Sequence, residues 1–172
     1  MSSARFLSSE SVVFPEIESS LSQNHESHHT AGAGSGNRRK GRELALQALY
    51  QIEMTGDASG AAVDHFLSHF EGNPRAKEFA RRLVSGVVSQ QVEIDRMIER
   101  CTENWKLMRL AKVDLIILRL ASYELIFCPD IPLNVSLDEA IEIGKRYGTA
   151  DSATFINGVL DQVAQSSGAK EH

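Results

Sequence analysis

LMRLAKVDLIILRLASYELIF, residues 107–127, is the stretch that decides the fold class. Apolar residues recur along it every three or four positions, which is the spacing of one face of an α-helix. The apolar face is broad, as expected for a helix that neighbours cover on several sides. Pro129 and Pro132 follow the stretch and predict its end. Charged residues interrupt it, so it does not predict a membrane span, which needs about 20 mostly apolar residues.

The same helical spacing continues toward the N-terminus. Apolar stripes predict helices over residues 38–54, 58–70 and 73–100, the last with a break near Ser89. Gly56 marks the end of the first. Asn73 and Pro74 are typical of a helix start, because asparagine caps free amides and proline has no amide to satisfy.

Two more helices are predicted after Pro132. Ser136-Leu137-Asp138-Glu139 matches a capping box, in which a serine and a glutamate satisfy each other's free backbone amides. Gly148 suits the left-handed position that ends this helix, and Asp151 and Ser152 suit the cap of the last one. No sustained alternation of apolar and polar residues predicts a strand. We therefore expect an all-α protein, a compact bundle of six to seven helices.

The composition indicates one globular domain with polar ends. The chain has 172 residues, of which 42% are hydrophobic, enough for a core. Residues 1–37 are predicted to form a disordered arm, residues 38–166 the domain and residues 167–172 a flexible tail. The N-terminus does not resemble a secretory or transit signal. Cys101 and Cys128 have no metal-type spacing, so we expect buried free thiols and a cytoplasmic protein.

The net charge of −5 is distributed unevenly. Residues 1–37 carry one arginine and four glutamates, and the chain after residue 42 has 13 basic and 19 acidic side chains. Between them lies Arg38-Arg39-Lys40-Gly41-Arg42, here called the basic cluster. A compact positive spot on an acidic body suits a local contact with RNA and a separate surface for a partner.

The basic cluster stands at the start of a predicted helix. Cations there face the positive end of the helix dipole, which typically costs about 0.3–1 kcal/mol each, and a bound phosphate reverses that balance. From the residues alone, nucleic-acid binding and a solvated, charged helix start are equally good interpretations. Gln47 and Tyr50 on the next turns and Phe155 in the last helix can extend such a site, although a core role is commoner for each aromatic.

Motifs for catalysis, phosphate loops and metal binding are missing from the sequence: it has no GxxxxGK[ST], GxGxxG, HExxH, CxxC or GxSxG. His65 and His69 have the spacing of zinc ligands on a helix, but no third ligand is evident, so we interpret them as surface histidines. Asp138, Glu139 and Glu142 are interpreted as first-turn and exposed charges rather than as an acid/base pair. The sequence thus predicts no enzyme, no cofactor and no metal site.

Four segments, in order and in register, resemble the NusB family of transcription antitermination factors. They are RRKGRELALQALYQ, VDLIILRLASYEL, IPLNVSLDEAIEIGKRYG and DSATFINGVLDQVA, and the resemblance covers residues 38 to about 165. It implies a helical fold of two packed subdomains that binds single-stranded boxA RNA of ribosomal RNA leader transcripts. The implied partners are NusE, a small-subunit ribosomal protein, and indirectly other Nus factors and RNA polymerase, which becomes resistant to termination.

The resemblance also implies site residues. The RNA-facing positions of the family fall on Arg38, Arg39, Lys40, Arg42, Gln47, Tyr50, Asp151 and Phe155. The acidic position that faces NusE falls on Asp114. Met108 is a departure, since some relatives have an acid near it on the NusE side. Trp105 stands where some relatives have a basic residue near RNA and is interpreted as core packing.

Two other interpretations stay open. The same helical domain occurs fused to ribosomal RNA cytosine methyltransferases, but the chain ends at His172 without the glycine-rich loop and catalytic cysteine of such an enzyme. The chain can also be a self-associating interaction module, because relatives are known as monomers and as dimers. A dimer across the first helix would hide the RNA site.

Overall fold

The computed structural model describes residues 33–102 and 106–168. Nearly all of the predicted arm, Trp105 and most of the tail lie outside the described residues. The all-α prediction is confirmed, because the described part of the chain contains helices and no strand. Its elements are α2 Ala33–Thr55, α3 Gly60–Ser68, α4 Pro74–Cys101, the 3-10 helix η1 Leu107–Arg109, α5 Lys112–Phe127, α6 Leu133–Tyr147 and α7 Ser152–Ser167.

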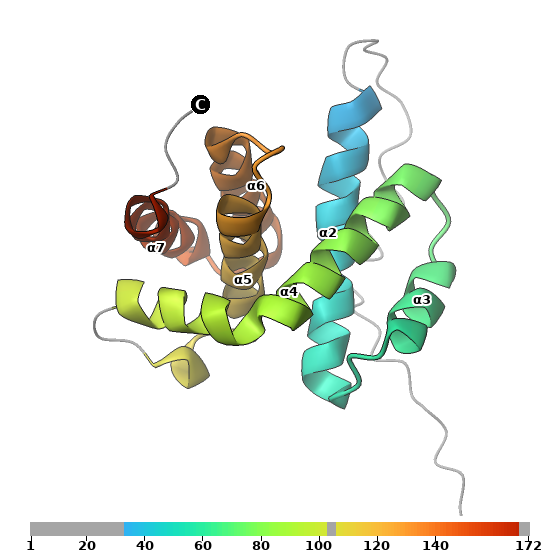
Figure 1. The fold of residues 1–172 in the computed structure, drawn as a ribbon, viewed down its shortest axis with the longest axis horizontal. Coiled ribbons are helices and arrows are strands. Elements are labelled where there is room, and N and C mark those ends of the chain that lie inside the picture. Colours follow the sequence, from blue (N-terminus) through green and yellow to red (C-terminus); the bar gives the residue numbers. More distant parts are fainter. Residues whose placement is uncertain (1–32, 103–105, 169–172) are drawn as a thin grey trace, which may run out of the picture. The chain divides into compact units, whose positions relative to one another are not determined.

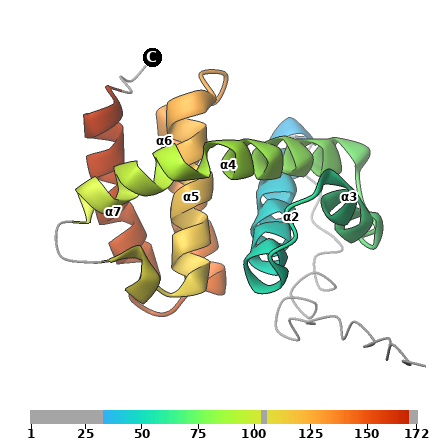
Figure 2. The ribbon, with the colours of Figure 1, turned by 60° about the horizontal axis from the view of Figure 1, so that its bottom comes forward.

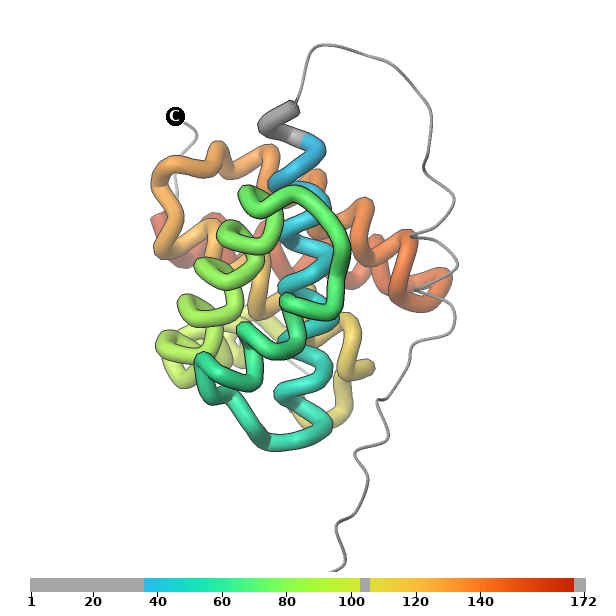
Figure 3. The backbone as a smooth tube through the Cα atoms, turned by 90° about the vertical axis from the view of Figure 1, so that its right-hand side faces the viewer, coloured from blue at the N-terminus to red at the C-terminus, as the bar shows by residue number. Residues whose placement is uncertain are grey.

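The helices form two groups that both pack against the long helix α4. At one end of the long helix α4, α2 and α3 pack against it, and at the other end lie α5, α6 and α7 (Figures 1 and 2). Helix α2 runs beside α4 (Figure 3) and also contacts α5. None of the described helices is long and apolar enough to cross a membrane.

Helix α5 is central, as its apolar pattern predicts. The consecutive residues Leu115, Ile116, Ile117 and Leu118 are all buried, so the helix is covered on every side along this part. The core continues into the buried residues of α2, α4, α6 and α7. The predicted helix over residues 107–127 is interrupted, however, because η1 ends at Arg109 and α5 begins only at Lys112.

Local sequence signals predicted some helix ends correctly. The side chain of Asn73 accepts a hydrogen bond from the Arg75 amide at 2.9 Å, as an N-cap does. Gly56 ends α2 with a φ of +75°, the left-handed conformation that glycine adopts without strain. The predicted break near Ser89 is wrong, since α4 is continuous there and the Ser89 hydroxyl donates to the Gly86 carbonyl at 3.0 Å.

Two predicted caps of α6 are wrong. The helix begins at Leu133, so Ser136 lies inside its first turn, where the hydroxyl donates to Glu124 Oε2 at 2.8 Å instead of capping. Gly148 has a φ of −92°, which is not left-handed. A glycine is favoured there by space, because a Cβ would lie 2.4 Å from Ser152 Oγ.

Helix α2 begins earlier than predicted. The predicted helix over residues 38–54 is longer at its N-terminal end, because α2 already runs from Ala33. The basic cluster therefore lies beyond the first turn. Since the helix dipole acts mainly within the first turn, the expected penalty at the helix start does not apply to these cations.

Candidate nucleic-acid interface

The residues of the basic cluster are consecutive in α2, so their side chains point in different directions around the helix axis. An α-helix turns by about 100° per residue, which places Arg38 and Arg42 on one face. Both guanidinium groups lie over the ring of Phe79 in α4, at 5.5 and 5.4 Å from its centroid. Arg39 pairs instead with Glu139 of α6, and Lys40 pairs with Glu43 of α2, which also binds Arg146 of α6. What looks like one positive spot in the sequence is two surfaces in the structure.

Arg42 lies inside the protein. It is 4% exposed, and its Nε and Nη2 donate to the two carboxylate oxygens of Glu124 in α5 at 2.8 Å each. Glu124 also accepts the Ser136 hydroxyl of α6, so this inner pair, Arg42–Glu124, joins three helices. A phosphate contact by Arg42, as predicted from the sequence, would require the inner pair to open.

Arg39 lies at the surface and forms the outer pair with Glu139 of α6. Its Nη2 donates to Glu139 Oε1 at 2.6 Å and its Nε lies 3.0 and 3.1 Å from the two carboxylate oxygens. These hydrogen bonds raise the pKa of the Arg39 guanidinium. Glu139 was expected to be an exposed charge, but it is buried, because the α2 arginines cover it.

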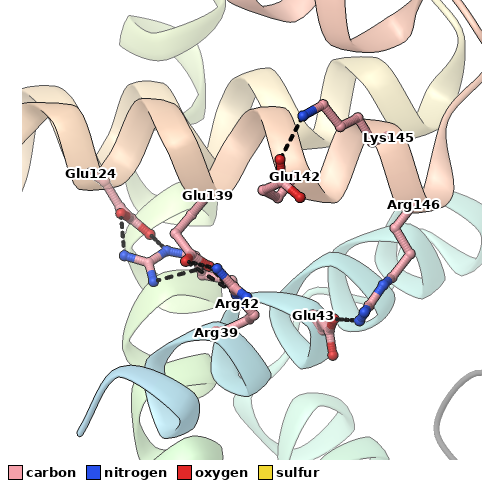
Figure 4. A network of polar contacts seen from close by, with 8 residues as sticks. All are labelled: Arg39, Arg42, Glu43, Glu124, Glu139, Glu142, Lys145 and Arg146. Atoms are coloured by element: carbon pink, nitrogen blue, oxygen red, sulfur yellow. Dashed lines mark hydrogen bonds and ion pairs between the residues drawn. The ribbon is translucent and has the colours of Figure 1, made fainter. Parts of the chain in front are cut away.

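Lys40 meets the C-terminal end of α6 through a shared carboxylate. Glu43, one turn along α2, is buried and lies 3.9 Å from Lys40 Nζ. Arg146 of α6 donates to the same carboxylate (Figure 4). Burial lowers the pKa of Lys40, Glu43 opposes this shift, and the charge of Arg146 adds to it. Two cations from distant parts of the chain therefore lie close together.

The other side of the basic cluster faces α4 and the loop after α5. Arg38 lies 3.6 Å from Asp130, which also accepts two hydrogen bonds from Arg82 of α4 at 2.6 and 2.9 Å. All three side chains are partly exposed. These hydrogen bonds hold the pKa of Asp130 below its usual range.

The remaining predicted RNA residues line the middle of α2 and the start of α7. Gln47 is buried, and its Nε2 has no hydrogen-bond partner among the described residues. Tyr50 and Phe155 are half-buried and pack against the core. Asp151 is exposed at the start of α7, which follows directly on the α6 end that carries Arg146. Its side chain does not cap α7, because the helix start is tied instead by the Thr149 amide donating to Ser152 Oγ at 2.8 Å.

The predicted partner side has a different character. Asp114 stands in the first turn of α5 and is buried, and its Oδ1 has no hydrogen-bond partner within the described part of the chain. Met108 in η1 is 96% exposed. The structure thus places the acid inside and an apolar side chain outside at this end of α5.

The sequence patterns did not predict Lys145 and Arg146 as site residues. Cations in the last turn of a helix are favourable with its dipole and are therefore ordinary there. Arg146 is paired with a carboxylate 103 positions away, so no local pattern points to it. His65 and His69 lie on the surface as expected, and no group of three metal-binding side chains occurs among the residues described.

A model of the NusB family matches residues 39–165. The transcription antitermination protein NusB of Desulfatibacillum aliphaticivorans is 47% identical over 136 residues, covering 79% of this chain and 95% of that protein. The corresponding protein of Myxococcus xanthus (strain DK1622) is 48% identical over 133 residues, or 75% and 95% of the two chains.

Solved structures agree with this assignment. T. maritima NusB has a TM-score of 0.68 at 43% identity, over 74% of this chain and 90% of that one. A structure of the antitermination factors NusB and NusE in complex with double-stranded RNA has a TM-score of 0.70 at 27% identity, over 77% and 98% of the two chains. The family match, the relatives and the fold together show that this chain belongs to the NusB family.

Proposed function

We propose that this chain is a transcription antitermination factor that binds boxA RNA of ribosomal RNA leader transcripts together with NusE. The observation that carries the proposal is the exposed edge of α2, where Arg39 and Lys40 reach the surface in a chain of the NusB family. Through NusE and other Nus factors the chain would act on RNA polymerase in the cytoplasm. It would do so as a binding protein and not as an enzyme.

The RNA contact divides into phosphate and base contacts. Arg39 and Lys40 neutralise backbone phosphates, which gives salt-dependent affinity with little sequence information. The half-buried Tyr50 and Phe155 offer ring edges and faces to unpaired bases, and the buried amide of Gln47 offers a donor. Asp151 borders this path at the start of α7. Arg42 acts indirectly, by fixing the position of α2.

The NusE contact is proposed for the end of α5 that carries Asp114 and Met108. Buried Asp114 shapes this surface from within, while exposed Met108 contributes apolar area to it. A bound partner with its own RNA surface would raise RNA affinity through effective concentration. Self-association across α2 would cover Arg39 and Lys40, so RNA binding and dimer formation would compete.

RNA binding by the Arg39→Ala, Lys40→Ala double variant tests the proposal. Fluorescence anisotropy with boxA-type RNA should show at least about a tenfold loss of affinity at low salt. The log–log salt slope should become shallower by about 1.4, because each lost phosphate contact on a single strand removes about 0.7. NusE should tighten binding by the unaltered chain.

The matched control is Arg96→Ala, Arg100→Ala, which removes the same charge from exposed positions of α4. This variant should bind as the unaltered chain does. If both double variants lose affinity equally, net charge alone explains binding, and the α2 edge is not the site.

A further inference from the structure

We propose that the C-terminal end of α6, through Arg146 supported by Lys145, is a second wall of the RNA site and contacts backbone phosphate opposite Arg39 and Lys40. This inference rests on the proposed function and adds residues that the basic cluster does not contain. Its starting point is the meeting of Lys40 and Arg146 at one carboxylate, Glu43.

The cations at this edge come from two helices. Arg39 and Lys40 belong to α2, and Lys145 and Arg146 belong to α6. Figure 4 shows Arg39, Lys145 and Arg146. The carboxylates among them, Glu43, Glu139 and Glu142, each pair with at least one of these cations. The edge therefore has four cations and three anions, although the whole chain has a net charge of −5. An RNA backbone approaching here meets a local positive excess.

Helix stability explains why a cation occurs at position 146, but it does not explain why the Arg146 side chain points toward α2. A cation in the last turn of α6 is favourable with the helix dipole wherever it points. Arg146 reaches across to Glu43 on α2, where Lys40 already supplies a positive charge. Placing two cations at one buried carboxylate costs repulsion and desolvation, as the lowered pKa of Lys40 shows. A phosphate at the same place would offset the repulsion.

The chemistry of Arg146 suits this ligand. Its side chain is 44% exposed, and its Nη1 is the atom that contacts Glu43. A guanidinium has further N–H groups in a planar fork that matches two phosphate oxygens. Lys145, exposed and held 2.7 Å from Glu142, adds a nearby point charge. Glu43 is then a positioning residue that orients Lys40 and Arg146 toward the same space.

Position along the site supports the same role. The ion pairs Arg39–Glu139 and Arg146–Glu43 follow one another along α2 in the direction of Gln47 and Tyr50. Asp151, at the start of α7, comes five positions after Arg146 in the chain. Arg146 thus lies between the phosphate contacts at one end of α2 and the proposed base contacts further along it.

The test is RNA binding by Arg146→Ala in the full chain, measured by anisotropy with boxA-type RNA over a series of salt concentrations. We expect a loss of affinity of about fivefold to tenfold at low salt and a salt slope shallower by about 0.7. The salt slope distinguishes a phosphate contact from a merely structural role. Loss of a structural role would lower the affinity but leave the salt slope unchanged. Arg146→Lys should keep the slope while losing part of the affinity.

Arg81→Ala is the matched control, because Arg81 on α4 is 48% exposed and likewise paired with a single carboxylate, Asp64. It should leave affinity and slope unchanged. If Arg146→Ala is unstable, Arg146→Gln, which keeps the side-chain stem, replaces it with the same expected slope.

The outcomes also separate this inference from the proposed function. An unchanged slope in Arg146→Ala, together with a shallower slope in Arg39→Ala, Lys40→Ala, would overturn the second wall and leave the α2 site standing. Unchanged binding in both variants would overturn both. A slope lowered in each variant would support both.

Discussion

Arg42 and Arg39 stand three positions apart on α2, and each pairs with a glutamate, yet their surroundings are opposite. Both partners of the inner pair Arg42–Glu124 are almost fully buried. In the outer pair the Arg39 side chain is 53% exposed. The difference follows from helical phase, since one face of α2 lies against α4 and α5 while the neighbouring face meets solvent. Residues of one charged run can therefore have structural and binding roles that the run itself does not distinguish.

The two pairs should differ most in their effect on stability. We expect Arg42→Ala to lower the free energy of unfolding by about 3–5 kcal/mol, because it leaves Glu124 as a buried charge without its main partner. Arg39→Ala should cost less, about 1–2 kcal/mol, because Arg39 is half-exposed and the buried Glu139 still has Arg42 Nη1 at 3.9 Å. Urea unfolding followed by circular dichroism measures both. Equal losses would mean that burial does not distinguish the two arginines.

Gly41, between the two arginines, tests how closely the buried face of α2 packs against α4. A Cβ at this position would lie 2.8 Å from both the Ala76 carbonyl oxygen and Phe79 Cδ1, so Gly41→Ala should push α2 away from α4. We expect a loss of about 1–3 kcal/mol in stability, as for other overpacked sites.

Gly158→Ala is the control for this effect. Gly158 lies inside α7, and an added Cβ would have no atom of another helix within 4 Å, so alanine should stabilise the protein by about 0.5–1 kcal/mol through helix propensity. Thermal unfolding should thus move in opposite directions for the two glycine variants. A gain for Gly41→Ala would show that α2 does not approach α4 this closely.

The smallest effect is expected on the Arg38 side, as a function of pH. Arg82 and Arg38 lower the pKa of Asp130, so this carboxylate contributes stability above the pKa of about 3.9 of a free aspartate, and the contribution is lost as the pH falls below it. Because Asp130 is substantially exposed, the contribution should stay within about 1 kcal/mol. The Tm of Asp130→Asn should lie slightly below that of the unaltered protein at pH 7 and approach it at pH 3. The same difference at both pH values would contradict this account.

Sequence patterns predicted elements that depend on neighbours along the chain. The central helix α5, the Asn73 cap and the Gly56 helix end each rest on local spacing or on one residue's conformational preference. The capping box failed for the opposite reason, because Ser136 donates to a carboxylate in another helix, 12 positions away.

The candidate site shows the same limit. The basic cluster is visible in the sequence, but its division into inner and outer faces depends on Glu124 and Glu139, which are 82 and 100 positions from their arginines. Arg146 was missed because nothing near it in the chain is unusual. Only the fold brings it to Glu43 and Lys40.

The inner pair also has a consequence for how this sequence can change over evolutionary time. Loss of either charge leaves its partner buried and uncompensated, so positions 42 and 124 should be replaced only together, by two apolar residues or by another matched pair. Arg39, Lys40 and Arg146 lie at the surface, where lysine and arginine can interchange in separate steps with little effect on folding. The fold thus couples the history of two distant codons, whereas the codons of the RNA edge are constrained by RNA binding and not by one another through folding.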